Sequence, residues 1–267
     1  MKKRTFLKNV IAVSALAKVA GSLSISTSLA AEGSGKREFY ELRAYRFKVG
    51  DETTLLDSYL EKAAVPALNR MGIDRVGVFT EPDAKEGPVI YMLIAYPSLE
   101  KFAEVSANFL KDPQLLKDGA DYLNTPKAKP AFARVDSWLL QAFSGMPVIE
   151  LSALSKEKKE RIFELRTYES HSELKAIKKI EMFNAGEIQV MRDVGLAPVF
   201  YGSTIMGSNM PHLVYMLSAE NKEEHKKHFG EFSKHPTWKK ISGDPQFADT
   251  VSKISSHFLV PTKYSQI

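Results

Sequence analysis

The chain has 267 residues, with 37 Lys and Arg against 32 Asp and Glu, and it has no cysteine. Five of the basic residues and none of the acidic ones lie within residues 1–30, so subtracting these five from 37 leaves 32 basic residues against 32 acidic ones. This balance excludes the overall positive field that is typical of a nucleic-acid-binding protein. The absence of cysteine excludes disulfide bonds and a lipid anchor attached to cysteine.

Residues 1–30 have the features of an export signal. They combine a basic start at residues 2–4, a weakly apolar stretch over residues 10–29 and a small-residue cleavage site at Ala30. Residues 3–8 (KRTFLK) resemble a twin-arginine export motif in which lysine replaces the first arginine. The stretch is rich in Ser and Ala and contains a lysine, whereas spanning a bilayer takes about 20 predominantly apolar residues. We therefore expect an exported, periplasmic protein without stable membrane insertion.

Residues 37–143 predict one ferredoxin-like domain with the order βαββαβ. Pro66 is expected to end or kink the first helix, because proline has no backbone N–H to continue the hydrogen-bond ladder. The expected elements are a strand at 40–45, a helix capped by Asp51, strands at 75–80 and 89–96, a helix capped by Ser98, a short helix after Pro113 and a strand at 135–142.

Residues 161–267 predict a second domain with the same order. The linker over residues 144–160 ends in a Lys- and Glu-rich run, which predicts a solvated segment on the surface. The expected elements are a strand ending at Tyr168, a helix at 172–194, strands at 197–202 and 213–217, a helix with a capping box at Asn221 and Glu224, and a strand at 252–260.

The two predicted domains share sequence, which indicates a duplication. The first strand is spelled YELRAY at residues 40–45 and FELRTY at residues 163–168, so the second copy begins 123 residues after the first. The segment Tyr91-Met92-Leu93 recurs as Tyr215-Met216-Leu217 at nearly the same offset. Several landmarks at one period indicate that a whole domain was duplicated.

These paired openings, together with residues 211–217 (PHLVYML), resemble the NIPSNAP family over nearly all of the chain after residue 37. The resemblance implies a ferredoxin-like unit of the dimeric α/β barrel superfamily, present here twice in one polypeptide. It does not imply a settled reaction. Related members of the superfamily include haem-binding enzymes and cofactor-free monooxygenases, but no histidine here can be mapped onto a haem ligand. We therefore expect no cofactor.

Two such units predict an α+β fold in which two tandem domains form an intrachain barrel. A four-stranded antiparallel sheet with helices on one side leaves its other face bare, and the two bare faces can cover each other. Alternation along the duplicated strand separates an apolar face from a polar row. We expect the Leu42 face to meet the helices and the polar rows to point into the space between the sheets. The rows are Glu41, Arg43 and Tyr45 in the first copy and Glu164, Arg166 and Tyr168 in the second.

Two interpretations of these rows stay open. The Glu and Arg residues can form ion pairs that fix how the two halves register, without any chemistry. Alternatively, the rows line a pocket for an anionic or hydroxylated small molecule, since Arg offers a planar fork for a carboxylate and Glu can accept a proton. His212, where a strand meets a loop, is a further candidate for lining this pocket, and its alternative is a simple loop histidine.

The remaining motifs point to no reaction. His225 and His228 lie three residues apart on a predicted helix, but their charged neighbours are typical of a solvated face, so no metal site is expected. No nucleophile elbow, phosphate loop or dinucleotide fingerprint is present in the sequence. The sequence therefore favours a protein that binds a small molecule between its two domains. Enzymatic activity and homo-oligomerisation stay open, and the alternative is a structural or interaction module with a filled barrel.

We expect the exported protein to begin near Ala31, because residues 1–30 carry the features of a cleavable signal. N-terminal sequencing of the protein from the native compartment measures this. A mature chain that begins at Met1, or one that stays in the membrane fraction after a carbonate wash, would contradict the export interpretation.

Overall fold

The computed structural model describes residues 36–267, and the predicted export signal at residues 1–30 lies outside this range. Within residues 36–267, no helix combines the length and the apolar character that crossing a membrane requires. The first half of the described part runs to residue 142. In chain order it contains β1 (Phe39–Arg46), α1 (Thr54–Tyr59), α2 (Val65–Arg70), β2 (Val76–Thr80), β3 (Val89–Tyr96), α3 (Leu99–Asn108), α4 (Pro113–Asp118), α5 (Ala120–Leu123) and β4 (Arg134–Ala142).

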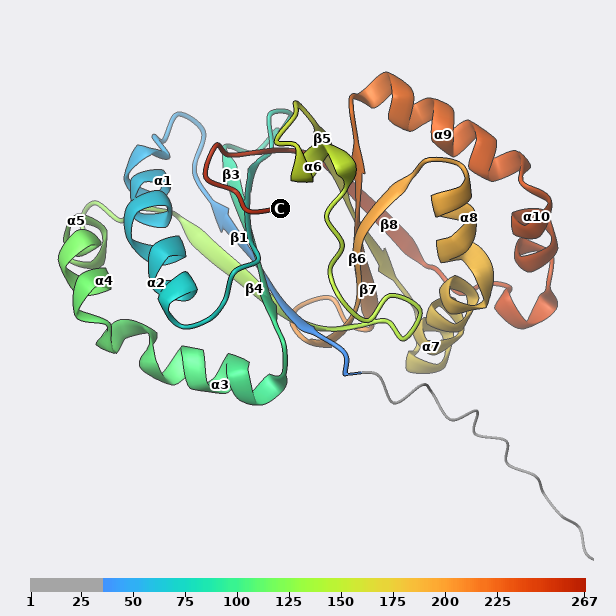
Figure 1. Cartoon of the computed structure of the whole chain (residues 1–267), viewed down its shortest axis with the longest axis horizontal. Coiled ribbons are helices and arrows are strands. Elements are labelled where there is room, and N and C mark those ends of the chain that lie inside the picture. The colour runs from blue at the N-terminus through green and yellow to red at the C-terminus, as the bar shows by residue number, and fades with distance from the viewer. Residues whose placement is uncertain (1–35) are drawn as a thin grey trace, which may run out of the picture. The chain divides into compact units, whose positions relative to one another are not determined.

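The second half repeats this order after a short helix in the linker. In chain order these elements are α6 (Ala153–Lys156), β5 (Ile162–Glu169), α7 (Glu173–Met182), α8 (Ile188–Asp193), β6 (Ala197–Met206), β7 (His212–Ala219), α9 (Lys222–Lys234), α10 (Pro236–Ser242) and β8 (Lys253–Pro261). Helices α1 to α5 lie on one side of the strands and helices α7 to α10 on the other (Figure 1).

Side-chain caps were predicted for three helices, and the structure confirms two of them. Ser98 accepts a hydrogen bond from the backbone N–H of Lys101, and Asn221 accepts one from Glu224, so both predicted caps are confirmed. The predicted Asp51 cap is wrong. Helix α1 begins at Thr54, and the Asp51 carboxylate instead accepts a hydrogen bond from the backbone N–H of Lys48 inside the preceding turn.

Both halves carry a π-helical turn at the same point of their first helix pair. The turns span Leu60–Ala64 and Phe183–Glu187, which are 123 residues apart. In the first half the helix passes through Pro66 and continues to Arg70, so the predicted end at this proline is wrong. Pro66 lies within the first two residues of α2, directly after the wider turn, where a missing N–H is tolerated.

The eight strands form one closed antiparallel barrel in the order β1-β3-β2-β8-β5-β7-β6-β4. Each half contributes four neighbouring strands, and the pairs β2–β8 and β4–β6 join the halves. The registers of the two halves coincide, because Leu42 lies between Leu93 and Trp138 while Leu165 lies between Met216 and His257. The predicted intrachain α/β barrel is therefore confirmed, with hydrogen-bonded strands at both seams.

The predicted direction of the two strand faces is wrong. The apolar face of the duplicated strand points into the barrel, and the Glu/Arg/Tyr rows point outward, beneath the helices. The interior of an eight-stranded barrel has room for little more than its own side chains, so burying two ion pairs and two further tyrosines there would be costly. The barrel core contains Tyr40, Leu42, Ala44, Phe79, Leu93, Leu140, Phe163, Leu165, Phe200, Val214, Met216 and Leu259.

Aromatic pairs connect the two halves inside the barrel. The rings of Tyr40 and Phe200 lie 5.0 Å apart between centroids, and those of Phe79 and Phe163 also lie 5.0 Å apart, edge to face. Burial of such a ring contributes roughly 1.5–3 kcal/mol, and an aromatic pair adds about 0.5–1.5 kcal/mol. The barrel core therefore holds the halves together.

The linker and the C-terminal residue cover one end of the barrel. Ile149 and Ile267 are buried among the barrel residues, and the C-terminal segment pairs with β2 through hydrogen bonds from Thr262 and Gln266. Arg161 donates a hydrogen bond to the main-chain oxygen of Ile267 at 2.8 Å. The linker was predicted to be solvated, and this is wrong for Met146 and Ile149, because their apolar side chains are buried.

Neither half is expected to fold as a monomer. Expressed alone, segments 37–143 and 161–267 would each expose an apolar sheet face and two unpaired strand edges, which favour association. Light scattering after size-exclusion chromatography and thermal denaturation measure the outcome, and we expect dimers or aggregates. Two monomeric halves that each unfold cooperatively would contradict the dependence of each sheet on the other.

Candidate functional site

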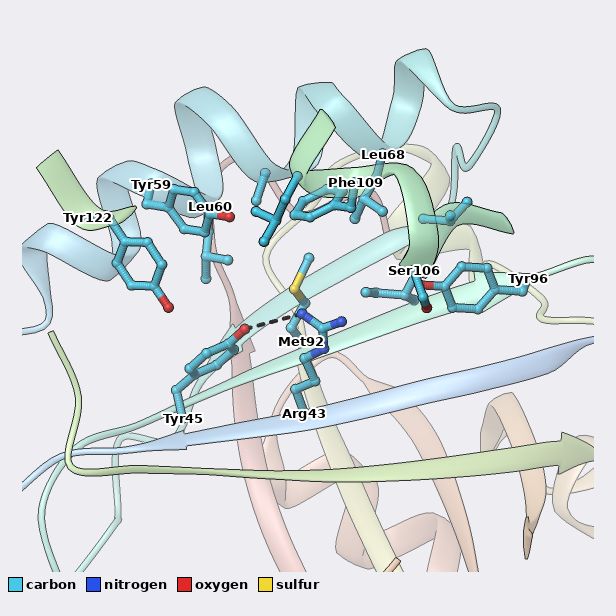
Figure 2. A pocket seen from close by; sticks show the side chains of 14 residues that line it. Arg43, Tyr45, Tyr59, Leu60, Leu68, Met92, Tyr96, Ser106, Phe109 and Tyr122 are labelled. Atoms are coloured by element: carbon cyan, nitrogen blue, oxygen red, sulfur yellow. Dashed lines mark hydrogen bonds between the residues drawn. The ribbon is translucent and has the colours of Figure 1, made fainter. Parts of the chain in front are cut away.

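A pocket of about 300 Å³ lies between the sheet and the helices of the first half. Strands β1 and β3 form its floor, and α1, α2 and α3 with their adjoining turns form its roof (Figure 2). Its lining is mostly aromatic and aliphatic. The lining residues are Arg43, Tyr45, Tyr59, Leu60, Ala64, Leu68, Met92, Ile94, Tyr96, Val105, Ser106, Phe109, Leu110 and Tyr122.

Arg43 rises from β1 into this pocket, beneath the helices (Figure 2). Its Nε donates a hydrogen bond to the Glu41 carboxylate at 2.6 Å. Glu41 is buried and also accepts hydrogen bonds from the hydroxyls of Tyr96 at 3.2 Å and Ser137 at 3.3 Å. Three donors therefore hold the carboxylate in place, and the carboxylate in turn fixes the orientation of the guanidinium.

Most of the Arg43 hydrogen-bond donors have no short partner within residues 36–267. A guanidinium has five N–H donors. Besides the Nε bond, Nη1 contacts the Tyr45 hydroxyl at 3.5 Å, which is long for a hydrogen bond. Burial opposes the charge of Arg43, but the nearby Glu41 carboxylate outweighs it and raises the pKa of Arg43 above its usual value. The pocket thus contains a permanently charged group with free donors.

Tyrosine hydroxyls supply the other polar groups of the pocket. The rings of Tyr59 and Tyr122 stack with centroids 4.0 Å apart and planes 14° apart. Burial raises the pKa of Tyr59 to about 12, and it also raises the pKa of Tyr96 and Tyr122 above the usual tyrosine value. These phenols therefore stay protonated at neutral pH. Tyr96 donates its proton to Glu41, whereas Tyr59 and Tyr122 can donate hydrogen bonds to a ligand.

In the second half the equivalent arginine is enclosed by its neighbours. Arg166 donates to Glu164 at 2.6 Å, and its guanidinium lies 5.2 Å from the ring centroid of Phe229 and 5.6 Å from that of Tyr168. Its side chain is 18% exposed, compared with 31% for Arg43. The duplicated Glu/Arg pair is thus part of a packed layer here, whereas in the first half it faces a cavity.

His225 completes this packed layer, contrary to its expected solvation. The ring is buried, and its Nε2 lies 2.7 Å from the second oxygen of Glu164. Burial raises the pKa of Glu164, but the hydrogen bond from His225 and the charge of Arg166 outweigh this effect, so the pKa lies below its usual value. The sequence could not show this, because one buried histidine was hidden among charged helix neighbours.

A buried ion pair lies beside the same layer. Lys179 and Glu187 are 2.7 Å apart, and both side chains are almost completely buried. The Lys179 ammonium lies 4.5 Å from the ring centroid of Phe183, which adds a cation–π contact. Among residues 36–267, no group of three or more His, Asp or Glu side chains is arranged to hold a metal ion.

The predicted site residues therefore fall into three places. Glu41, Arg43 and Tyr45 lie below the helices of the first half, with Arg43 and Tyr45 in the pocket. Their counterparts Glu164, Arg166 and Tyr168 lie below the helices of the second half, so the structure does not bring the two rows together. His212 lies apart from both, at the mouth of the barrel.

Sequence reasoning missed the aromatic lining of the pocket. Tyr59 and Tyr96 come from a helix and from the end of β3, and at the same positions of the second half stand Met182 and Ala219, each 123 residues later. A position-by-position comparison of the two copies could have indicated this difference. Tyr122 comes from the short helix α5, which no sequence pattern predicted.

The family model for NIPSNAP matches residues 40–139 and again residues 163–266. The chain belongs to the NIPSNAP family. The two matched segments coincide with the two halves of the barrel, so the NIPSNAP unit is the four-stranded half with its helices. No relative among the curated proteins matches the sequence.

Solved structures share the whole two-half fold. The chain is similar to a candidate monooxygenase from Lactobacillus acidophilus, with 12% identity, a TM-score of 0.56, and coverage of 84% of this chain and 94% of that one. It is also similar to a candidate monooxygenase from Fusobacterium nucleatum, with 11% identity, a TM-score of 0.53, and coverage of 85% and 93%. At these identities the likeness shows the fold alone.

A third solved structure is similar over a smaller part of the chain. A NIPSNAP-like domain protein from Burkholderia xenovorans has 20% identity and a TM-score of 0.36, and the match covers 40% of this chain and 89% of that one.

Proposed function

We propose that this NIPSNAP protein binds a small amphipathic carboxylic acid in the pocket of its first half. The observation that supports this most is the Arg43 guanidinium, which faces a 300 Å³ pocket with most of its donors unused. Arginine is suited to a carboxylate because its planar fork can donate two parallel hydrogen bonds. The ligand carboxylate would therefore lie on Arg43.

The charge balance of the pocket fits a single carboxylate. Glu41 already offsets the charge of Arg43, so a bound carboxylate leaves one net negative charge. The hydroxyls of Tyr45 and Tyr59 lie in the same pocket and can donate hydrogen bonds to that charge. A second acidic group on the ligand would have no cation of its own in this lining, so we expect monocarboxylates to bind better than dicarboxylates.

The pocket walls indicate the chemistry of the part of the ligand that lies beyond its carboxylate. Phe109, Met92 and Ile94 belong to an otherwise apolar lining, and the pocket volume is near the lower end of the range for small-molecule sites. A polar body would lose its hydration without finding partners on these walls. A six-membered aromatic ring or a short aliphatic chain fits both the size and the chemistry.

Side chains fill the centre of the barrel, which supports a scaffold role for the space between the halves rather than a ligand site there. The alternative function, an interaction module without a ligand, therefore competes with the proposal only at the helix-covered pocket. The likeness to candidate monooxygenases is compatible with a reaction on the bound acid. We place the binding activity in the periplasm as a proposal that rests on residues 1–30 of the sequence.

Replacing Arg43 by Met should weaken binding of 3-phenylpropanoate by about 10- to 100-fold, since a hydrogen bond to a charged group contributes about 1.5–3 kcal/mol. Isothermal titration calorimetry measures this. The neutral amide 3-phenylpropanamide is the matched ligand control, and we expect it to bind weakly to both proteins, because it lacks the charge that Arg43 recognises.

Arg166→Met is the matched protein control, because it removes the same group from the other copy of the strand. It should lower the Tm more than Arg43→Met does, since Arg166 is less exposed and packs on two rings. Its affinity for 3-phenylpropanoate should equal that of the unaltered chain. If Arg43→Met binds the acid as tightly as the unaltered chain does, or if the unaltered chain does not bind it at all, the proposal is wrong.

A further inference from the structure

A second cavity lies at the mouth of the barrel, at the end opposite the buried C-terminal residue. Its volume is about 150 Å³, and both halves contribute to it. The apolar side chains of Leu42, Leu165 and Val214 belong to its lining and continue the barrel core, while polar side chains from the strand ends surround them. The Arg43 pocket shares no residue with this cavity.

His212 contributes a ring nitrogen with a defined role to this mouth. Its Nδ1 lies 3.1 Å from the main-chain oxygen of Asn209. A carbonyl oxygen can only accept, so Nδ1 carries the proton, and in a neutral ring Nε2 is left as an acceptor. Burial lowers the pKa of His212 below its usual value, which keeps the ring neutral near pH 7.

His257 is held in the same way by a carboxylate. Its Nδ1 lies 2.7 Å from Glu81 Oε1, and the Tyr91 hydroxyl donates to the other oxygen of Glu81 at 3.3 Å. Glu81 therefore fixes the tautomer and the orientation of the ring, and Nε2 is again the nitrogen without a partner among residues 36–267. Two histidines from the second half thus line one small cavity, each with a free Nε2.

The first half has no such groups at the equivalent positions. Val89 pairs with Arg46 as His212 pairs with Glu169, and Trp138 pairs with Leu42 as His257 pairs with Leu165. The two copies therefore differ in polarity at these two positions, with histidines in the second half where the first half has Val89 and Trp138.

The charged groups at the rim are already paired. Arg46 lies 2.7 Å from Asp136, and Lys253 lies 3.1 Å from Glu169. Each of these charges is therefore offset by a partner of opposite sign. A neutral ligand with hydroxyl groups can hydrogen-bond to both free Nε2 atoms without disturbing these pairs, because a hydroxyl both donates and accepts.

We infer that the barrel mouth binds a short, uncharged polyol, with one hydroxyl donating to Nε2 of His212 and another hydrogen-bonded to Nε2 of His257. The cavity has the room of roughly five water molecules, at about 30 Å³ each. A molecule of the size of glycerol fills it, with its carbon chain against Leu42 and Leu165. The hydroxyls replace waters that the two nitrogens would otherwise bind.

The test is a titration of the full chain, labelled with ¹⁵N-histidine, with glycerol as the probe. Two-bond proton–nitrogen correlation spectra report each ring nitrogen separately. We expect the Nε2 signals of His212 and His257 to shift together and to saturate with one dissociation constant. The exposed ring of His171 and the half-buried ring of His235 should not follow, and 1-propanol, which has one hydroxyl, should need at least a tenfold higher concentration.

His257→Phe, which gives the mouth a ring on this wall as Trp138 does on the other, should abolish the saturable shift at His212. His171→Phe is the matched control on an exposed ring and should leave it unchanged. If His257→Phe does not fold, the test rests on the unaltered chain, where only the Nε2 signals of His212 and His257 should shift and saturate. Shifts that do not saturate, that affect all six histidines alike, or that persist in folded His257→Phe would overturn the inference. Tighter saturation by lactate than by glycerol would overturn the assignment to a neutral ligand.

Discussion

The packing of two apolar sheet faces against each other is the constraint on which the rest of this structure depends. It closes the barrel at the β2–β8 and β4–β6 seams and fills the interior with side chains such as Leu42, Leu165 and Met216. Because alternate residues of a strand point to opposite faces, this packing sends Arg43 and Arg166 outward, beneath the helices. Which strand face points inward therefore sets the location of every candidate group except those at the barrel mouth.

The duplication shows how one local motif can have two outcomes. Both copies keep the Glu/Arg pair at 2.6 Å, and both keep the π-helical turn above it. In the second half, His225 and Phe229 surround the arginine, and the pair contributes to folding. In the first half the helices leave a cavity over Arg43, so the same pair can position a guanidinium for a ligand. The surrounding residues, and not the motif, decide between structure and binding.

The sequence predicted the duplication, the order of the strands and the intrachain barrel, because alternation and period are local signals. It could not predict which strand face points inward. Both faces are covered in this fold, one by helices and one by the opposite sheet, so the choice depends on the width of the closed barrel. The sequence also could not show that Tyr59, Tyr96 and Tyr122 line one pocket, since they come from separate elements that meet only in the folded chain. His212 lies beside a cavity to which both halves contribute, and not beside the Glu/Arg/Tyr rows.

The central claim is that the carboxylate ligand binds on the helix-covered side of the first sheet and not in the interior of the barrel. Two methionines on opposite faces test it directly, because Met92 lines the Arg43 pocket and Met216 lies in the barrel core. In a methyl-labelled full chain, the ring current of added 3-phenylpropanoate should shift the Met92 methyl signal and leave the Met216 signal in place. A shift at Met216 with none at Met92 would contradict the account and return the binding site to the space between the sheets.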